Sequence, residues 1–274
     1  MEVSAKRCLD QVTRSTDPSA TLRAVRLPMT MTRTQKRLLL VLVGATVLAV
    51  GPGVNAGGSA SVGGQAPTFT FKGSGELDWI STPVRYKPSN ESKVMMRMPQ
   101  FRSDYRPTTV LALDVKRKAG KAAWYKISVP GRPNGRTGWI PAAAVKLRQV
   151  TRQIVIYRSA RRMELWRGNT REYATTVAVG APGMETPTGL FYVTWKFDTR
   201  IDSDWAILGN FAFETSAYSK LTDWPGGGIV GVHGTPWPEL LGQAVSHGCV
   251  RLANRDVEFL RNRVPLGTPV KIVR

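Results

Sequence analysis

The side chains best suited to chemistry lie together near the C-terminus: His233, His247 and Cys249. They include the only two histidines of the 274-residue chain, and both lie within sixteen residues of the cysteine. A thiol attacks a carbonyl efficiently only as a thiolate, and an adjacent imidazole helps to form the thiolate by taking its proton. The clustering therefore predicts that Cys249 is a nucleophile and that His233 is its proton acceptor and donor.

The residues around this pair fit the same chemistry. Residues 229–232 have the composition of a buried strand that delivers His233 at its end, where flanking glycines are expected to leave the imidazole exposed. Gly248 has no side chain next to the sulfur, so backbone N–H groups can approach the reacting carbonyl as an oxyanion hole. Arg251 follows the thiol by two residues and can hold a substrate carboxylate through two hydrogen bonds.

Short β-strands and one short helix are expected to position these residues within 151–274. A helix is predicted to start at a cap on Asn254, with Asp256 in its first turn. The less regular stretch 195–228, which ends in three glycines, is interpreted either as part of the core or as a lid over the site. Apolar runs bounded by turn residues predict strands at 153–157, 163–166, 172–179, 190–197 and 269–273.

A second β-rich segment is expected at residues 76–148. Apolar runs separated by turn residues include the pair Asn134-Gly135, which is typical of a hairpin turn. Trp139 is expected to pack in the core of this module. The basic residues Lys116, Arg117, Lys118 and Lys121 are interpreted as a solvated face. The Gly/Ser-rich residues 57–75 before it are predicted to be a flexible linker.

The charge distribution indicates export rather than nucleic-acid binding. Basic residues precede an apolar run at 38–50 that is too short for a membrane-spanning helix, so 31–56 is predicted to be a signal peptide. Residues 1–30 are interpreted as an upstream leader or a misassigned start. The remaining chain has 31 Lys and Arg against 16 Asp and Glu but shows no nucleic-acid-binding motif, so an anionic cell envelope is the expected partner. Cys249 would then be the sole thiol.

The motifs resemble those of a known family. His233-Gly-Thr and Ser246-His247-Gly248-Cys249-Val250-Arg251-Leu252, with the segment 178–193 upstream, resemble the YkuD-type catalytic domain of L,D-transpeptidases. The resemblance covers residues 151–274 and implies a mainly β fold, a β-sandwich with one short helix. The module at 76–148, which ends in Gly-Trp-Ile-Pro, resembles the bacterial SH3-like barrels appended to cell-wall enzymes.

The resemblance implies a secreted, extracytoplasmic cell-wall enzyme whose donor and acceptor are both peptidoglycan stem peptides. Cys249 would form a thioester with the third-position diamino acid and release D-alanine, and an amine of a second stem would resolve the thioester. Ser246, Gly248 and Gly234 would shape the pocket, while His247 and Arg251 would orient the motif and the donor. No cofactor or metal is implied, carbapenems are expected to act as inhibitors, and membrane contact is expected only through an uncleaved signal segment.

Four alternatives remain open at this stage. Water in place of the amine would make the protein an L,D-carboxypeptidase with the same catalytic residues. His233, His247 and Cys249 would supply three ligands of a zinc site. A papain-like peptidase would normally place its cysteine before its histidine, the reverse of the order in this chain. An inactive wall-binding protein would retain the cluster without using it.

Overall fold

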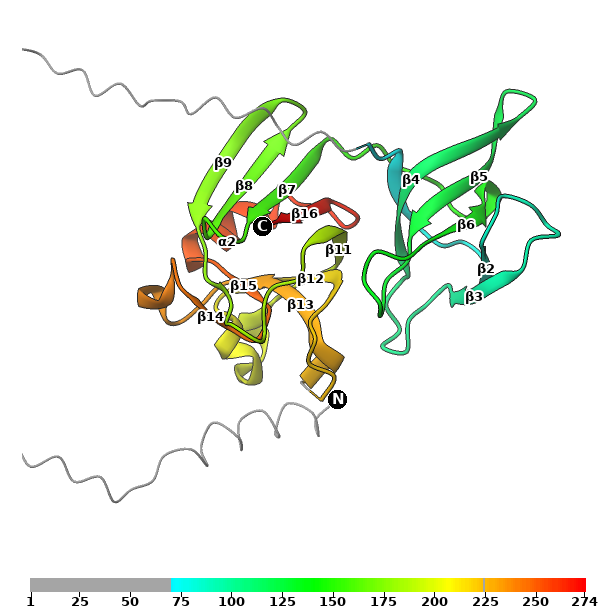
Figure 1. Ribbon diagram of the computed structural model, residues 1–274. Helices are drawn as coiled ribbons and strands as arrows, with labels where there is room; N and C mark the ends of the chain where they lie inside the picture. The colour runs from blue at the N-terminus through cyan, green and yellow to red at the C-terminus, as the bar shows by residue number, and fades with distance from the viewer. Residues whose placement is uncertain (1–69, 224) are drawn as a thin grey trace, which may run out of the picture. The chain divides into compact units, whose positions relative to one another are not determined.

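The C-terminal strands form one eight-stranded ladder in the order β15-β13-β12-β11-β16-β7-β8-β9 (Figure 1). The computed structural model describes residues 70–223 and 225–274, so the predicted leader and signal peptide lie outside the described residues. The strands of this ladder are β7 (Arg152–Tyr157), β8 (Arg162–Arg167), β9 (Thr170–Thr176), β11 (Gly189–Asp198), β12 (Phe211–Tyr218), β13 (Ile229–His233), β15 (Val250–Arg251) and β16 (Pro269–Val273). Two further strands, β10 (Val179–Gly180) and β14 (Ala244–Ser246), form a separate parallel pair.

The long strand β11 joins the two halves of this ladder. Its first four residues pair with β16, and its remainder pairs with β12. Side chains from both halves meet in one apolar core, which includes Ile154, Leu165, Phe213, Val232 and Leu260. The mainly β class is therefore confirmed, and the layered packing expected of a sandwich arises here from one continuous ladder rather than from two separate sheets.

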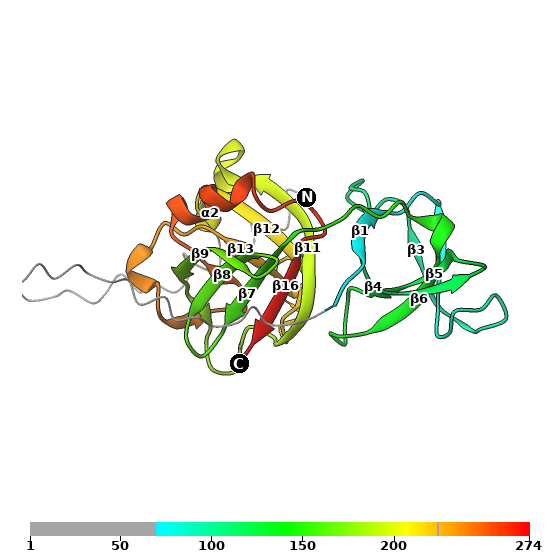
Figure 2. The ribbon, with the colours of Figure 1, turned by 90° about the horizontal axis from the view of Figure 1, so that it is seen from above.

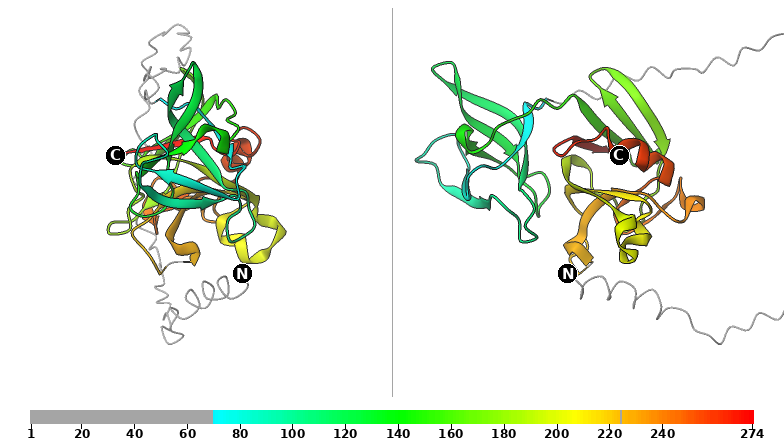
Figure 3. Two further views of the ribbon diagram at one scale, coloured as in Figure 1. Left: turned by 90° about the vertical axis from the view of Figure 1, so that its right-hand side faces the viewer. Right: turned by 180° about the vertical axis from the view of Figure 1, so that it is seen from behind.

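The C-terminal strand β16 lies inside this ladder. It pairs antiparallel with β11 on one side and parallel with β7 on the other. Figure 3 shows this segment in red between the green strands and the yellow and orange strands. The expected strand at 269–273 is present with those bounds, and its apolar residues Val270 and Ile272 are buried.

The helix α2 (Asn254–Arg261) packs against β12 (Figure 2) and buries Val257 and Leu260. The prediction of an Asn254 cap was wrong, because the cap position is Ala253 and no side chain caps the helix. The Asn254 side chain instead accepts a hydrogen bond from the Asn210 N–H (3.0 Å). Short 3-10 helices are η2 (Ala142–Ala144), η3 (Thr199–Ile201), η4 (Ser203–Leu208), η5 (Pro225–Gly228) and η6 (Pro238–Leu240).

Within the stretch 195–228 the strand β12 belongs to the core, whereas the 3-10 segment around Trp205, which is 41% exposed, does not. In β12, Phe211 and Phe213 are buried, so these two aromatic side chains belong to the packed interior. Only residues 219–228 remain as a connection between β12 and β13. Its three consecutive glycines have φ values of 75°, 64° and 75°, in the region that favours glycine.

The N-terminal module is a six-stranded sheet in the order β1-β4-β5-β6-β2-β3. Its core includes Leu77, Val84, Val110, Ile127 and Ile140. Whether this sheet is an SH3-like barrel stays a prediction. Its strands are β1 (Gly73–Glu76), β2 (Ser81–Arg85), β3 (Val94–Pro99), β4 (Thr109–Lys118), β5 (Lys121–Ser128) and β6 (Thr137–Pro141). All described residues belong to one compact unit, and no helix among them is long and apolar enough to cross a membrane.

Three details of the module were tested by the structure. The Asn134-Gly135 turn lies between β5 and β6 as expected. The linker prediction extended too far, because β1 begins at Gly73 and pairs closely with the backbone of Arg148. The expectation that Trp139 packs in the core was wrong: successive residues of a strand face opposite sides, and it is the next residue that is buried, while Trp139 itself is half-buried.

Candidate active site

The strands β13 and β15 bring the predicted site residues together. They pair in parallel, with His233 in register with Arg251, and Cys249 directly precedes β15. Residues paired across neighbouring strands project to the same face of the sheet. This pairing places the imidazole, the thiol and the guanidinium close together, although sixteen residues separate the histidine from the cysteine along the chain.

Gly231 lies where the thiol and the imidazole approach each other. A Cβ atom on this glycine would lie 3.5 Å from His233 Cδ2 and 3.8 Å from Cys249 Sγ. The Gly231 N–H donates a hydrogen bond to the same sulfur (3.3 Å). The missing side chain therefore leaves open the space that the sulfur and the imidazole both border.

The His233 side chain is buried, with 4% of its surface exposed, so the prediction of an exposed imidazole was wrong. Its Nδ1 lies 2.6 Å from the Gly234 carbonyl oxygen. Because a carbonyl only accepts, this contact places the proton of the neutral ring on Nδ1 and leaves Nε2 unprotonated. Burial lowers the pKa of His233 to about 4, and the positive charge of Arg251 acts in the same direction.

Cys249 is half-buried and rests as a thiol. Burial raises the pKa of Cys249, while the Gly231 N–H and the charge of Arg251 act in the opposite direction. With the cysteine pKa raised and the histidine pKa lowered, both partners are neutral near pH 7. Both shifts therefore favour a neutral thiol beside a neutral imidazole over a thiolate–imidazolium pair.

The buried imidazole makes a prediction about stability. The unfolded His233 binds a proton below about pH 6.5, whereas the folded one does so only below about pH 4. Between these values the unfolded state binds more protons, so acidification through this window should lower the free energy of unfolding by about 3 kcal/mol. Urea unfolding of the wild type and of His233→Gln across pH 4–7 measures this. The difference between the two curves should change only below about pH 6.5, and a constant difference contradicts the prediction.

Hydrogen bonds within the loop that carries Cys249 stabilise this loop. The buried Ser246 hydroxyl donates to the Cys249 carbonyl (2.6 Å) and accepts from the Gly248 N–H (3.1 Å). We predicted that Gly248 lets backbone N–H groups approach the reacting carbonyl. This explanation was incomplete, because the Gly248 N–H is already bonded to Ser246. The φ of 117° at Gly248 and the Ser219 Cβ, 2.9 Å from the position of an added Cβ, explain the glycine. His247, within this loop, is half-buried, and burial lowers its pKa.

Arg251 supplies the positive charge of the site. It lowers the pKa of His233, His247 and Cys249, which shows that the guanidinium is within electrostatic range of all three side chains. The guanidinium lies 5.9 Å from the ring centroid of Trp237, and its buried Nε makes no hydrogen bond to any described residue. Arg251 as a whole is only half-buried, so the rest of its guanidinium can meet an anionic ligand.

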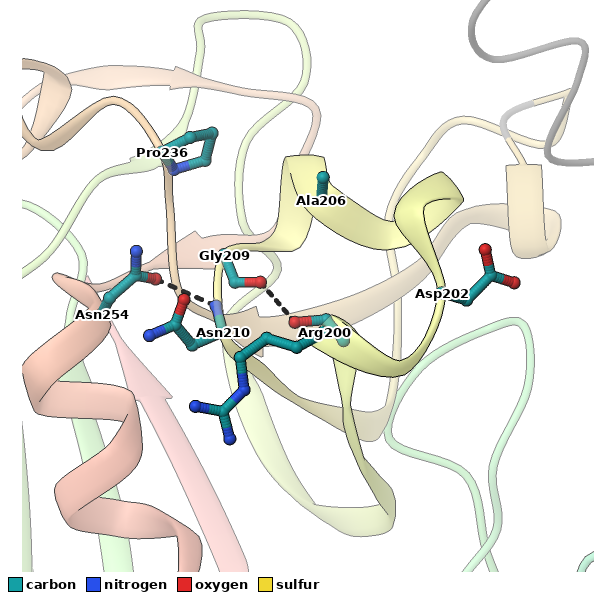
Figure 4. A pocket seen from close by; sticks show the side chains of 8 residues that line it. Arg200, Asp202, Ala206, Gly209, Asn210, Pro236 and Asn254 are labelled. Atoms are coloured by element: carbon teal, nitrogen blue, oxygen red, sulfur yellow. Dashed lines mark hydrogen bonds between the residues drawn. The ribbon is translucent and has the colours of Figure 1, made fainter.

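Behind His233 the chain is held by close backbone packing. An added Cβ on Gly234 would lie 2.2 Å from Asn254 Oδ1, so only glycine fits there. The same Asn254 oxygen accepts from the Asn210 N–H, and both residues border a cavity of about 290 Å³ beside Pro236 (Figure 4). Neither the thiol nor the imidazole lines this cavity. Gly234 thus allows close packing of the backbone next to His233 and does not shape a pocket around the thiol.

The histidine and cysteine side chains do not assemble a metal site. Within residues 70–223 and 225–274, no three His, Cys, Asp or Glu side chains lie close enough together to hold one metal ion.

Sequence analysis missed Gly231 and Ser219 as residues of the site. A glycine inside an otherwise apolar strand is a known sign of close approach by another group, and that signal was available for Gly231. Ser219 carried no such signal, because its contact with Gly248 depends on how residues 219–228 fold back after β12.

An imidazole at the end of β13 and a thiol directly before β15 thus lie close together in a mainly β domain, and comparisons with known proteins show which family this domain belongs to. The YkuD family, described as the L,D-transpeptidase catalytic domain, matches residues 151–272. A protein of Bacillus subtilis named putative L,D-transpeptidase YkuD is 30% identical over 174 residues, covering 63% of this chain and 90% of that protein. The chain belongs to the L,D-transpeptidase family.

Two further similarities were found. Putative L,D-transpeptidase YqjB of Bacillus subtilis is 36% identical over 110 residues, which cover 38% of this chain and 61% of that protein. The crystal structure of L,D-transpeptidase 3 from Mycobacterium tuberculosis aligns with 61% of this chain and 92% of its own, with a TM-score of 0.41 and 15% sequence identity.

Proposed function

We propose that the protein is a peptidoglycan L,D-transpeptidase that links third-position diamino acid residues of two stem peptides through a thioester on Cys249. The observation that carries the proposal is the shared space at Gly231, where the thiol and the imidazole face each other within a chain of the L,D-transpeptidase family. The buried, hydrogen-bonded His233 supports its role as the base, because its tautomer is fixed with Nε2 unprotonated.

In the first half-reaction, Cys249 attacks the carbonyl that joins the diamino acid to the terminal D-alanine. As the C–S bond forms, His233 Nε2 takes the thiol proton. The imidazolium then gives this proton to the departing nitrogen, the C–N bond breaks, and D-alanine leaves with a free amine. Because both groups are neutral at rest, no charge is separated until the substrate is bound.

In the second half-reaction, the side-chain amine of another stem's diamino acid attacks the thioester. His233 takes a proton from the attacking nitrogen, the C–S bond breaks, and the sulfur recovers its proton from the imidazolium. Water in place of the amine yields a trimmed stem, so the carboxypeptidase alternative uses the same residues. The balance between the two activities therefore depends on how well the amine excludes water from the thioester.

The donor is held by Arg251 in this proposal. Its Nε is buried without a partner and its charge acts on the thiol and on both histidines, so a donor carboxylate bound to it lies near the sulfur. We also propose that the protein works outside the membrane after export, with the N-terminal module as an SH3-like domain at the anionic wall. Of the surplus positive charge of residues 57–274, most lies in this module.

The proposal is tested with a purified stem tetrapeptide as the donor. Release of D-alanine, a thioester of the expected mass on the peptide that contains Cys249, and a crosslinked dimer when acceptor stem is added are the expected results. Alkylation of Cys249 beforehand should remove all three. A carbapenem should acylate the same residue, because its strained β-lactam carbonyl is a reactive acyl donor. Absence of both D-alanine release and the carbapenem adduct overturns the proposal, whereas D-alanine release without dimers favours the carboxypeptidase.

A further inference from the structure

The N-terminal module reaches the loop that lies next to the nucleophile. Residues 130–136 form the loop between β5 and β6 of the module. Residues 219–228, named here the glycine loop, connect β12 to β13 and lead directly into the strand that carries His233. These two loops are joined by hydrogen bonds from side chains of the first to the backbone of the second.

Arg132 holds the glycine loop through three carbonyl groups. Its Nε and Nη2 donate to the Ser219 carbonyl (3.3 and 2.9 Å), and Nη2 also donates to the carbonyls of Leu221 (2.8 Å) and Gly227 (3.0 Å). The acceptors come from both ends of the loop, so a single guanidinium ties the ends together. The three N–H groups on Nε and Nη2 are shared among these carbonyls, and the planar guanidinium holds them in a fixed direction, whereas the ammonium of a lysine is a single point on a flexible stem.

Asn134 fixes the residue before the glycine loop. Its amide nitrogen donates to the Tyr218 carbonyl (2.7 Å), and its amide oxygen accepts from the Tyr218 N–H (3.0 Å). The pairing of β12 with β13 is irregular before Tyr218, so this side chain takes the place of a strand neighbour. The guanidinium of Arg132 lies 5.0 Å from the centroid of the Tyr218 ring and adds a cation–π contact.

The glycine loop in turn supports the nucleophile. The Ser219 Cβ would lie only 2.9 Å from a Cβ on Gly248, so the serine packs directly against the backbone beside the sulfur. Ser246 bridges Gly248 and Cys249 by its two hydrogen bonds. A continuous set of contacts therefore runs from Arg132 through Ser219 and Gly248 to the nucleophile.

We propose that Arg132 and Asn134 are positioning residues of the active site, by which the N-terminal module holds the glycine loop against Gly248 and keeps Cys249 in its reactive geometry. The module is thus part of the catalytic unit and not only a wall-binding appendage. The effect on acylation rests on the proposed function, while the effect on the glycine loop and on the exposure of the thiol does not.

The N-terminal module also contacts the rest of the chain through residues other than Arg132 and Asn134, so the role of Arg132 can be tested by itself. Arg102 and Arg106 pair with Glu214, and the buried Tyr192 hydroxyl donates to the Thr109 carbonyl (3.1 Å). These contacts do not involve Arg132, so its replacement by alanine should loosen the glycine loop and leave the module in place.

The experiment compares full-length Arg132→Ala, Arg132→Lys and Asn134→Ala with wild type. Arg117→Ala is the matched control, because Arg117 belongs to the same module and, among the described residues, its guanidinium bonds only to the nearby Gly120 carbonyl (3.1 Å). Amide hydrogen exchange is measured for residues 219–228. Alkylation by iodoacetamide is measured over a range of pH on the peptide that contains Cys249, because the full-length chain also has Cys8. Acylation is measured with a carbapenem and with the tetrapeptide donor.

For Arg132→Ala we expect faster exchange in the glycine loop, faster alkylation with its midpoint at lower pH because the sulfur is less buried, and acylation slower by about 10- to 100-fold. The loss should appear in kcat and leave KM little changed, since the guanidinium of Arg132 is bonded to the backbone of the glycine loop. Arg132→Lys should recover part of the lost acylation rate. Asn134→Ala should change the exchange, alkylation and acylation rates in the same direction as Arg132→Ala, and Arg117→Ala should match the wild type in all three.

Opposite changes in alkylation and acylation separate positioning from a general loss of structure, which would lower protection throughout the chain. If Arg132→Ala fails to fold, Asn134→Ala carries the same test. Wild-type exchange and alkylation in these variants overturn the proposal whatever the enzyme's reaction is. Absence of acylation in the wild type instead counts against the proposed function and leaves the exchange and alkylation results to decide the positioning role.

Discussion

His233→Ala is expected to lower the rate of Cys249 acylation near pH 7 by about 10³- to 10⁴-fold, at the upper end of the range for general acid–base catalysis. The thiol has a raised pKa and depends on the imidazole to remove its proton during attack. Without the imidazole, only the small fraction of molecules in which Cys249 is already a thiolate reacts. Carbapenem acylation followed by intact mass, or by loss of the β-lactam chromophore, gives the rate constant directly.

The pH dependence of this variant identifies the mechanism. In His233→Ala the residual rate should rise about tenfold per pH unit up to the pKa of the thiol, because the thiolate must form unaided. The wild-type rate should stay nearly level above the low pKa of His233, since the neutral base is already present there. A flat profile in the variant means that another group activates the sulfur.

The two histidines should differ in these measurements. His247→Ala is expected to slow acylation less than His233→Ala does, because His247 is half-buried within the braced nucleophile loop and supports its shape. Cys249→Ala provides the baseline, with no adduct at any pH. If His247→Ala abolishes acylation and His233→Ala does not, the base has been assigned to the wrong residue.

Residue types and local patterns were sufficient to predict the reacting pair. Histidine and cysteine are scarce in this chain, and the apolar run before His233 has the composition of a buried strand, which the structure contains as β13. The strand β16 was predicted with its bounds for the same reason: Pro, Gly and Thr bracket a short apolar run. A strand can be predicted from the sequence where its own residues and the turn residues next to it determine its bounds.

Predictions failed where distant packing decides the structure. Strand β12 is buried on both faces, so it lacks the alternation of polar and apolar residues that marks a half-exposed strand, and it was interpreted partly as a lid. The burial of His233 was missed because the Gly234 carbonyl and the core around β13 enclose the ring only after folding.

The contacts of Arg132 and Asn134 illustrate the same limit more strongly. Their partners lie 84 to 95 residues further along the chain and are mainly backbone atoms. Backbone acceptors have no sequence signature, so an arginine and an asparagine in a turn look like ordinary solvent-exposed turn residues. The connection of the module to the nucleophile becomes apparent only from the folded chain.

Gly231→Ala is expected to leave the fold intact and to lower acylation by about 100-fold or more. The added methyl group would meet His233 Cδ2 at 3.5 Å and Cys249 Sγ at 3.8 Å, which are ordinary contact distances, and the backbone there is not in the left-handed region. The melting temperature should therefore be unchanged or slightly higher, because alanine restricts the unfolded chain. The methyl group would occupy the space that the sulfur, the imidazole and the substrate carbonyl must share.

A double variant distinguishes this mechanism from a general disturbance. If the methyl group acts by separating thiol from imidazole, adding Gly231→Ala to His233→Ala should cost little more than His233→Ala alone, because the proton transfer is already lost. Fully additive losses indicate instead that the methyl group excludes the substrate without disturbing the pair. Wild-type acylation in Gly231→Ala contradicts the proposal that proton transfer occurs in the opening at Gly231.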